Sequence, residues 1–136
     1  MKILFTWELG GGLGHLTREA PIARALAARG HEVLFAVRDC RVAEAVLGKD
    51  GLSFVQAPVP VLVRPVPHMI ESYPGYASVL AAWAFGEVDC LHGLFGAWRH
   101  WLAAYRPDAV VCDFSPVAQW SAHLRSEEHT SELQSH

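Results

Sequence analysis

The sequence is poor in cysteine and in charge, and both shortages narrow the classes of protein it can belong to. Its 3 cysteines are widely spaced and form no CxxC pair, which argues against a disulfide framework and against a zinc site. A reducing cytoplasm is therefore the expected compartment. Lys and Arg number 11 against 14 Asp and Glu, so the chain lacks the basic excess of a nucleic-acid-binding surface.

Long apolar runs are lacking as well. No apolar stretch reaches the roughly 18 residues that a membrane-spanning helix needs, which leaves at most a peripheral contact with a membrane. The chain starts without the basic region and cleavage site of a signal peptide. Hydrophobic residues make up 51% of the 136 residues and charged ones only 18%, a balance typical of a folded domain. A chain of this length predicts one domain with a buried core.

The first 30 residues predict a buried strand, a glycine-rich turn and a helix. Residues 2–7 (KILFTW) are apolar and rich in β-branched and aromatic side chains, as in a parallel strand covered on both faces. Residues 10–14 (GGGLG) hold four glycines in five positions, which lets the backbone approach a ligand closely. We expect the loop to become a helix at His15, with Thr17 as a candidate N-cap, and the helix to stop at Gly30.

The rest of the chain alternates strands and helices with short connections. Further strands are expected at residues 31–37, 52–56 and 109–112, and further helices at 41–47, 76–85, 88–105 and from Ser115 onward. Strand–helix–strand units form parallel sheets with right-handed crossovers. The predicted fold class is therefore α/β, a Rossmann-like doubly wound parallel sheet.

Residues 57–75 interrupt this regularity. Five prolines rule out a helix there and predict an extended loop. Long loops in compact domains are often functional, and the apolar residues of this one suggest that it lines or covers an apolar cleft. Simple packing of the loop on the core is the equally open alternative. In the helix that follows, His92 and His100 lack the i,i+4 spacing of a helical metal pair, so no metal site is expected.

The last twelve residues break abruptly with the composition of the rest. Eleven of them are polar, and RSEEHTSELQS at residues 125–135 resembles the conceptual translation of a short-read sequencing adapter. We therefore expect residues 1–124 to be an incomplete Rossmann-like domain and residues 125–136 to be a non-native tail. A solvated terminal helix is the alternative. In an incomplete sheet the strand at 109–112 would form an unprotected apolar edge.

Two residues at predicted strand ends are candidates for catalysis. In a doubly wound sheet the ligand crevice lies at the carboxyl ends of the strands, where the strand order reverses. If the first and fourth strands are neighbours, His15 and Asp113 converge on that crevice. A histidine oriented by a carboxylate is a general-base dyad. Taken singly, the histidine would be an ordinary turn residue and the aspartate a helix N-cap.

The glycine turn by itself allows other functions. The dinucleotide fingerprint G-x-G-x-x-G is not completed, because His15 stands where the third glycine belongs, and no P-loop Lys-Ser/Thr pair is present. A dinucleotide-binding oxidoreductase domain remains one alternative, with Arg38 or Asp39 contacting the ribose. A non-catalytic ligand-binding α/β module, in which the pairing of His15 with Asp113 is accidental, is another.

The order of these motifs resembles a known family. The chain resembles the N-terminal, acceptor-side domain of GT-B glycosyltransferases. The features that carry this resemblance are, in order, a strand, GGGLGH, an Ala-rich helix with one proline, RGHEV and RPDAVVCD. The nearest likeness is to the nucleotide-sugar-dependent, UDP-glycosyltransferase-like enzymes, and a more distant one is to the peptidoglycan GlcNAc transferase. The resemblance spans residues 1–124.

This resemblance implies a hexosyltransferase that moves a sugar from a UDP- or TDP-sugar to a hydroxyl of a small-molecule or lipid acceptor, without a cofactor or metal. His15 would be the general base that deprotonates the acceptor, and Asp113 would orient it. Gly11, Gly12 and Gly14 would shape the loop that faces the donor phosphates. Direct displacement would invert the anomeric carbon. Because the donor-binding domain is missing, this fragment alone is expected to be inactive.

Overall fold

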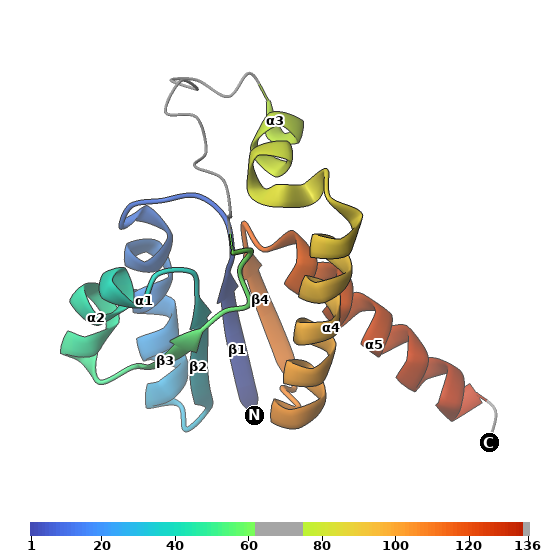
Figure 1. The fold of residues 1–136 in the computed structure, drawn as a ribbon. Coiled ribbons are helices and arrows are strands. Elements are labelled where there is room, and N and C mark those ends of the chain that lie inside the picture. Colours follow the sequence, from blue (N-terminus) through green and yellow to red (C-terminus); the bar gives the residue numbers. More distant parts are fainter. Residues whose placement is uncertain (62–74, 135–136) are drawn as a thin grey trace.

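Four parallel strands form a single sheet in the computed structural model, which describes residues 1–61 and 75–134 (Figure 1). The strands are β1 (Lys2–Trp7), β2 (Glu32–Val37), β3 (Ser53–Gln56) and β4 (Ala109–Asp113). Their order is β3-β2-β1-β4, so the chain adds strands on one side of β1 and then crosses to the other. The predicted α/β parallel sheet is confirmed, β1 and β4 are neighbours, and β4 forms an edge among the described strands.

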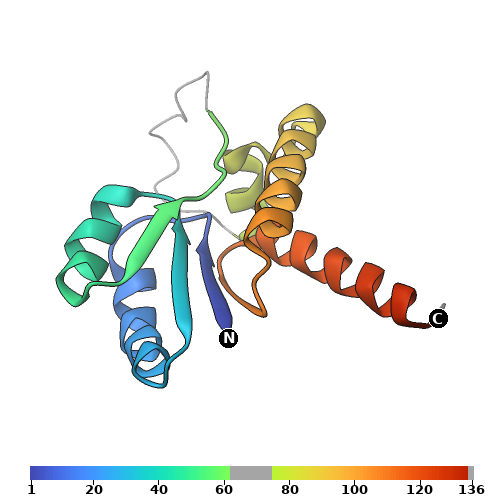
Figure 2. The same ribbon diagram turned by 90° about the horizontal axis from the view of Figure 1, so that it is seen from below.

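Helices cover both faces of this sheet. They are α1 (Gly14–Ala28), α2 (Cys40–Leu47), the short 3₁₀ helix Gly48–Asp50, α3 (Tyr76–Leu80) with the π-helical turn Ala81–Phe85, α4 (Val88–Tyr105) and α5 (Pro116–Gln134). Figure 2 shows α1 and α2 on one side of the sheet and α4 with the start of α5 on the other. None of the described helices combines the length and the apolarity needed to cross a membrane.

The core consists of two buried clusters separated by the sheet. Successive side chains of a strand point to opposite faces, so Phe5 and Trp7 of β1 pack in the cluster beneath α1 and α2. Leu4, which directly precedes Phe5, points to the other face and packs with Trp98 of α4 and Val117 of α5. Both faces of β1 are thus apolar, as its continuous hydrophobic sequence predicts.

For α1, the predicted N-cap is wrong and the predicted C-terminal stop is confirmed. The helix begins at Gly14, three residues before the expected N-cap, and the hydroxyl of Thr17 donates to the carbonyl of Leu13 at 3.0 Å. Thr17 therefore bonds backward inside the first turn and does not cap it. Gly30 does end the helix: its φ is +87°, its N–H bonds to Ala27 at 3.0 Å and the next N–H reaches back to Leu26, a Schellman closure.

Two sequence-based predictions concern segments that the structure describes only in part. Residues 62–74, which include most of the predicted cleft-lining loop, lie outside the described residues. Among the described residues of that loop, Val59 packs against the buried cluster that contains Leu4, Trp98 and Val117. Helix α5 passes the expected boundary at residues 124 and 125 without a break, and its C-terminal end points away from the sheet in Figures 1 and 2. The assignment of residues 125–136 as a non-native tail stays a prediction.

Candidate active site

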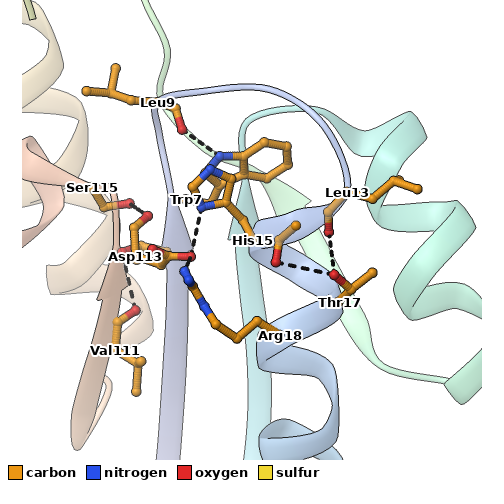
Figure 3. A network of polar contacts seen from close by, with 11 residues as sticks. Trp7, Leu9, Leu13, His15, Thr17, Arg18, Val111, Asp113 and Ser115 are labelled. Carbon is orange, nitrogen blue, oxygen red and sulfur yellow. Dashed lines mark hydrogen bonds and ion pairs between the residues drawn. The ribbon is translucent and has the colours of Figure 1, made fainter. Parts of the chain in front are cut away.

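His15 and Asp113 lie in direct contact at the carboxyl end of the sheet. The imidazole Nδ1 is 2.8 Å from Asp113 Oδ2 (Figure 3). The contact follows from the topology: β1 ends at Trp7 opposite Asp113 of β4, and the glycine turn brings the first turn of α1 back over that point. The two side chains are only 20% and 19% exposed. The predicted convergence is confirmed, while the roles of the two residues remain predictions.

The charge of Asp113 fixes the tautomer of its partner. Partial burial raises the pKa of the Asp113 carboxyl, but hydrogen bonds from His15 and Arg18 outweigh it and hold the pKa below its usual value of 3.8. The group is therefore a carboxylate at neutral pH and can only accept hydrogen bonds. Nδ1 of His15 must then carry the proton, which leaves the lone pair of a neutral imidazole on Nε2. A base with an unprotonated ring nitrogen is what proton abstraction requires.

Arg18 is a third member of this cluster that the sequence analysis did not identify. Its guanidinium Nη2 donates to the same Asp113 Oδ2 at 2.7 Å, and its side chain is 67% exposed (Figure 3). The signal was available, because Arg18 stands three residues after His15 and so shares its face of α1. Asp113 is thus shared between a histidine on one side and a permanent cation on the other.

Two aromatic rings lie nearly parallel to the imidazole of His15. The ring centroid of Trp7 is 5.4 Å from that of the imidazole, and the centroid of Phe114 is 5.9 Å from it. Phe114 adopts φ +50°, a left-handed conformation that is uncommon outside glycine. Its carbonyl accepts a hydrogen bond from the N–H of Leu9 at 3.1 Å, which ties the turn after β4 to the turn after β1. Tyr76 of α3 continues the row of rings, 5.5 Å from Phe114.

The glycine turn lies beside this cluster, with its members in different settings. Gly12 has φ +82°, and Gly11 and Gly14 surround it, with Gly14 already the first residue of α1. A Cβ added at any of these three would meet no other atom within 4 Å. The backbone of the predicted phosphate-facing loop is therefore open to a ligand, and its binding role stays a prediction.

Glu19 is a buried acid next to the dyad that sequence reasoning also missed. It is 5% exposed, and its Oε2 has no hydrogen-bond partner among the described residues. Burial, reinforced by the negative charge of Asp113 and only partly offset by Arg18, raises the pKa of Glu19 from 4.5 to about 7. A signal was present here too. Together with Leu16, Ala20 and Ala23 the residue completes the i, i+3, i+4, i+7 stripe by which α1 faces the sheet.

Glu8, the first residue after β1, holds the helices of the opposite layer in place. Its Oε1 accepts from Trp98 Nε1 at 2.8 Å, and its Oε2 accepts from the backbone N–H groups of Val117 and Ala118 at 2.9 and 3.1 Å. The carboxylate thereby caps the N-terminus of α5 and satisfies two of its free donors. Burial nevertheless raises the pKa of Glu8, outweighing these hydrogen bonds.

The residues named for the dinucleotide alternative have partners within the chain. Asp39 caps α2 by accepting from the N–H of Arg41 at 2.9 Å. Arg38 donates to the carbonyl of Glu8 at 3.1 Å, and its guanidinium lies 3.5 Å above the ring of Trp83. Within the described part of the chain, no three His, Cys, Asp or Glu side chains are placed to hold a metal ion, and the three cysteines are free thiols.

Comparison with known proteins gives a structural likeness without a sequence match. No family model matches the chain, and no curated protein sequence is significantly similar to it. The glycosyltransferase SsfS6 of Streptomyces sp. SF2575 is 22% identical over 93% of this chain, with a TM-score of 0.60. VinC in complex with dTDP is 21% identical over 90%, with a TM-score of 0.58. The spinosyn rhamnosyltransferase SpnG, complexed with spinosyn aglycone, is 21% identical over 87%, with a TM-score of 0.55.

These likenesses concern the fold and only part of each protein. The chain spans 37%, 32% and 30% of the lengths of SsfS6, VinC and SpnG. It therefore has the fold of about a third of a GT-B glycosyltransferase, in agreement with the resemblance drawn from its motifs. A shared fold does not carry a shared activity, so the function has to be argued from the site.

Proposed function

We propose that this chain is the acceptor-side part of a two-domain glycosyltransferase, in which His15 is the general base. The observation that carries the proposal is the 2.8 Å contact between His15 Nδ1 and Asp113 Oδ2 at the carboxyl end of β4. In the reaction, Nε2 takes the proton of an acceptor hydroxyl as its oxygen attacks the anomeric carbon of the sugar. The bond from that carbon to the donor's diphosphate oxygen breaks in the same step, and the nucleoside diphosphate leaves with the bonding electrons. Asp113 then stabilises the imidazolium that forms.

The donor is proposed to be a UDP- or TDP-sugar. Support comes from the open space at Gly11, Gly12 and Gly14 and from VinC and SpnG, which are described in complex with dTDP and thymidine diphosphate. SpnG is also described in complex with an aglycone, which fits a small-molecule acceptor. The expected stereochemical result is inversion, since the base and the attacking hydroxyl act in one displacement. The donor-binding domain lies outside this chain, so the chain alone is expected to be inactive.

The first test is to read the source gene past the codon of Leu124 and to express the protein it encodes. Incubation with UDP- and TDP-sugars and a panel of hydroxylated apolar acceptors should give products heavier by one sugar residue. His15→Ala should abolish that transfer while the thermal unfolding transition stays in place. Transfer at an undiminished rate in the folded His15→Ala protein would contradict the role of the base. A reading frame that truly stops at residue 136 would contradict the two-domain proposal.

A further inference from the structure

A cleft lies between α4 and α5, on the side of the sheet opposite α1 and α2. Figures 1 and 2 show α5 diverging from α4 toward its C-terminal end, and the cleft between the two helices has a volume of about 430 Å³. Helix α4 contributes Gly96, Arg99 and Leu102 to its lining, and α5 contributes Ser121 and Leu124. A volume of this size is within the range of small-molecule binding sites.

The hydroxyl of Ser121 is a buried polar group without a partner. Ser121 lines the cleft and is only 2% exposed, and its Oγ makes no hydrogen bond to any described residue. A serine inside a helix can donate to the carbonyl four residues earlier, which is that of Val117 here, but this bond is not formed. Because a buried hydroxyl without a partner lowers stability, this one is available to a polar group that enters the cleft.

Arg99 gives the cleft a positive charge. Its side chain is exposed, and no carboxylate in the described part of the chain forms an ion pair with it. The described lining residues include no acid, while His100 adds an imidazole and Leu102 and Leu124 add apolar surface. Arg125 also lines the cleft, but it belongs to the predicted non-native tail, so the charge is assigned to Arg99 alone.

We propose that this cleft binds a small organic anion with an apolar body. Its carboxylate or phosphate is held by Arg99, its apolar body lies against Leu102 and Leu124, and it accepts a hydrogen bond from Ser121. A guanidinium matches the geometry of either anionic group and binds it through charge-assisted hydrogen bonds. The cleft shares no lining residue with the proposed catalytic dyad, so the site does not depend on the function proposed above.

The test uses this chain and three probes that share one apolar body, namely naphthyl phosphate, naphthoate and naphthol, which is uncharged at neutral pH. Binding is followed by the amide chemical shifts in heteronuclear NMR spectra. At least one of the two anions should bind with a dissociation constant on the order of 1 mM or lower and shift the amides around Gly96 and Ser121. Naphthol should bind about tenfold more weakly. Equal binding of naphthol, or shifts confined to the surroundings of His15, would overturn the proposal.

Two substitutions test the polar contacts of the anion that binds. Arg99→Gln should raise its dissociation constant about tenfold, because it removes the charge from the proposed contact. Arg29→Gln, which removes an exposed arginine at the end of α1, is the matched control and should leave the constant unchanged. Ser121→Ala should raise the constant about fivefold. Unchanged constants in Arg99→Gln and Ser121→Ala would overturn the proposal.

A third substitution fills the cleft. A Cβ added at Gly96 or at Gly93 would meet no other atom within 4 Å, and only Gly96 lines the cleft. Gly96→Leu should therefore abolish binding, whereas Gly93→Leu, on the same helix, should bind as wild type does. Equal binding by the two variants would count against the site. If circular dichroism shows that Gly96→Leu does not fold, Arg99→Gln decides, because its change is at an exposed position.

The same titration on the longer protein from the source gene tests whether the cleft stays open there. The chain spans only about a third of the glycosyltransferases that it is similar to, so further parts of the protein could cover α4 and α5. Shifts retained around Gly96 and Ser121 would support the site. Loss of these shifts would mean that the rest of the protein fills the cleft, and it would overturn the proposal.

Discussion

The buried carboxyl of Glu19 should make the stability of this protein fall as the pH rises toward neutrality. The pKa of Glu19 is raised from 4.5 to about 7 in the folded state, so the folded protein binds this proton more tightly than the unfolded chain does. Between these two values the free energy of unfolding decreases with pH, and above about pH 7 the full penalty is present. At 1.36 kcal/mol per pH unit the penalty is about 3 kcal/mol.

The substitution that isolates this contribution is Glu19→Gln, which keeps the shape of the protonated acid and never ionises. Urea unfolding of both proteins at pH 5 and pH 8 gives the difference in their free energies of unfolding at each pH. That difference should move by about 2–3 kcal/mol in favour of the glutamine variant at pH 8. Any pH-independent effect of the new amide on the free energy of unfolding cancels, because it is present at both pH values.

Glu44→Gln is the matched control, because it makes the same chemical change at an exposed position on α2. The control should show no comparable movement between the two pH values. A difference between wild type and Glu19→Gln that is the same at pH 5 and pH 8 would refute the reasoning. It would mean that the carboxyl is already solvated or paired in the folded protein.

Three further predictions concern neighbouring features of the site and fold. Asp113→Asn should lower the pKa of the Glu19 carboxyl, measured as the midpoint of its titration by carbon-13 NMR, because the charge of Asp113 helps to raise that pKa. An unchanged or higher midpoint would contradict this coupling. Glu8→Ala should lower the free energy of chemical unfolding by about 3 kcal/mol or more, because it leaves three buried donors without an acceptor. Trp98→Phe removes only one of these donors and should lower it by about 1 kcal/mol plus the loss of packing. Equal losses in the two variants would rule out the cap. Gly30→Ala should destabilise by about 1 kcal/mol in the same assay, because its φ of +87° places a side chain in the left-handed region, and a stabilised variant would contradict the Schellman closure.

The strands and helices that position the site could mostly be predicted from the sequence, because their hydrophobic patterns fit the topology of a parallel sheet. Apolar strands with short helical crossovers allow few arrangements, and the carboxyl ends of β1 and β4 had to meet if those strands paired. That placed His15 near Asp113. The transition from loop to helix predicted at His15 is within one residue of the observed start of α1 at Gly14. The prediction of Thr17 as the N-cap is wrong, because its hydroxyl bonds backward to the carbonyl of Leu13.

Arg18 and Glu19 were missed for a different reason. A charged residue on a helix usually faces water, and the depth at which α1 packs on the sheet decides whether it does so here. Arg18 is exposed and still reaches the dyad, while Glu19, one position later, is buried.

The two buried acids differ in how far the fold explains their burial. Glu8 is buried with both carboxylate oxygens hydrogen-bonded, and it joins α4 and α5 to the end of β1, so its position is explained by the fold. Glu19 is buried in an apolar stripe with an oxygen that lacks a partner among the described residues, and a leucine or methionine there would fit the stripe better. Stability alone therefore does not account for Glu19. Its burial one helical turn after His15, with a pKa raised in part by the charge of Asp113, is typical of the perturbed groups that gather at catalytic sites.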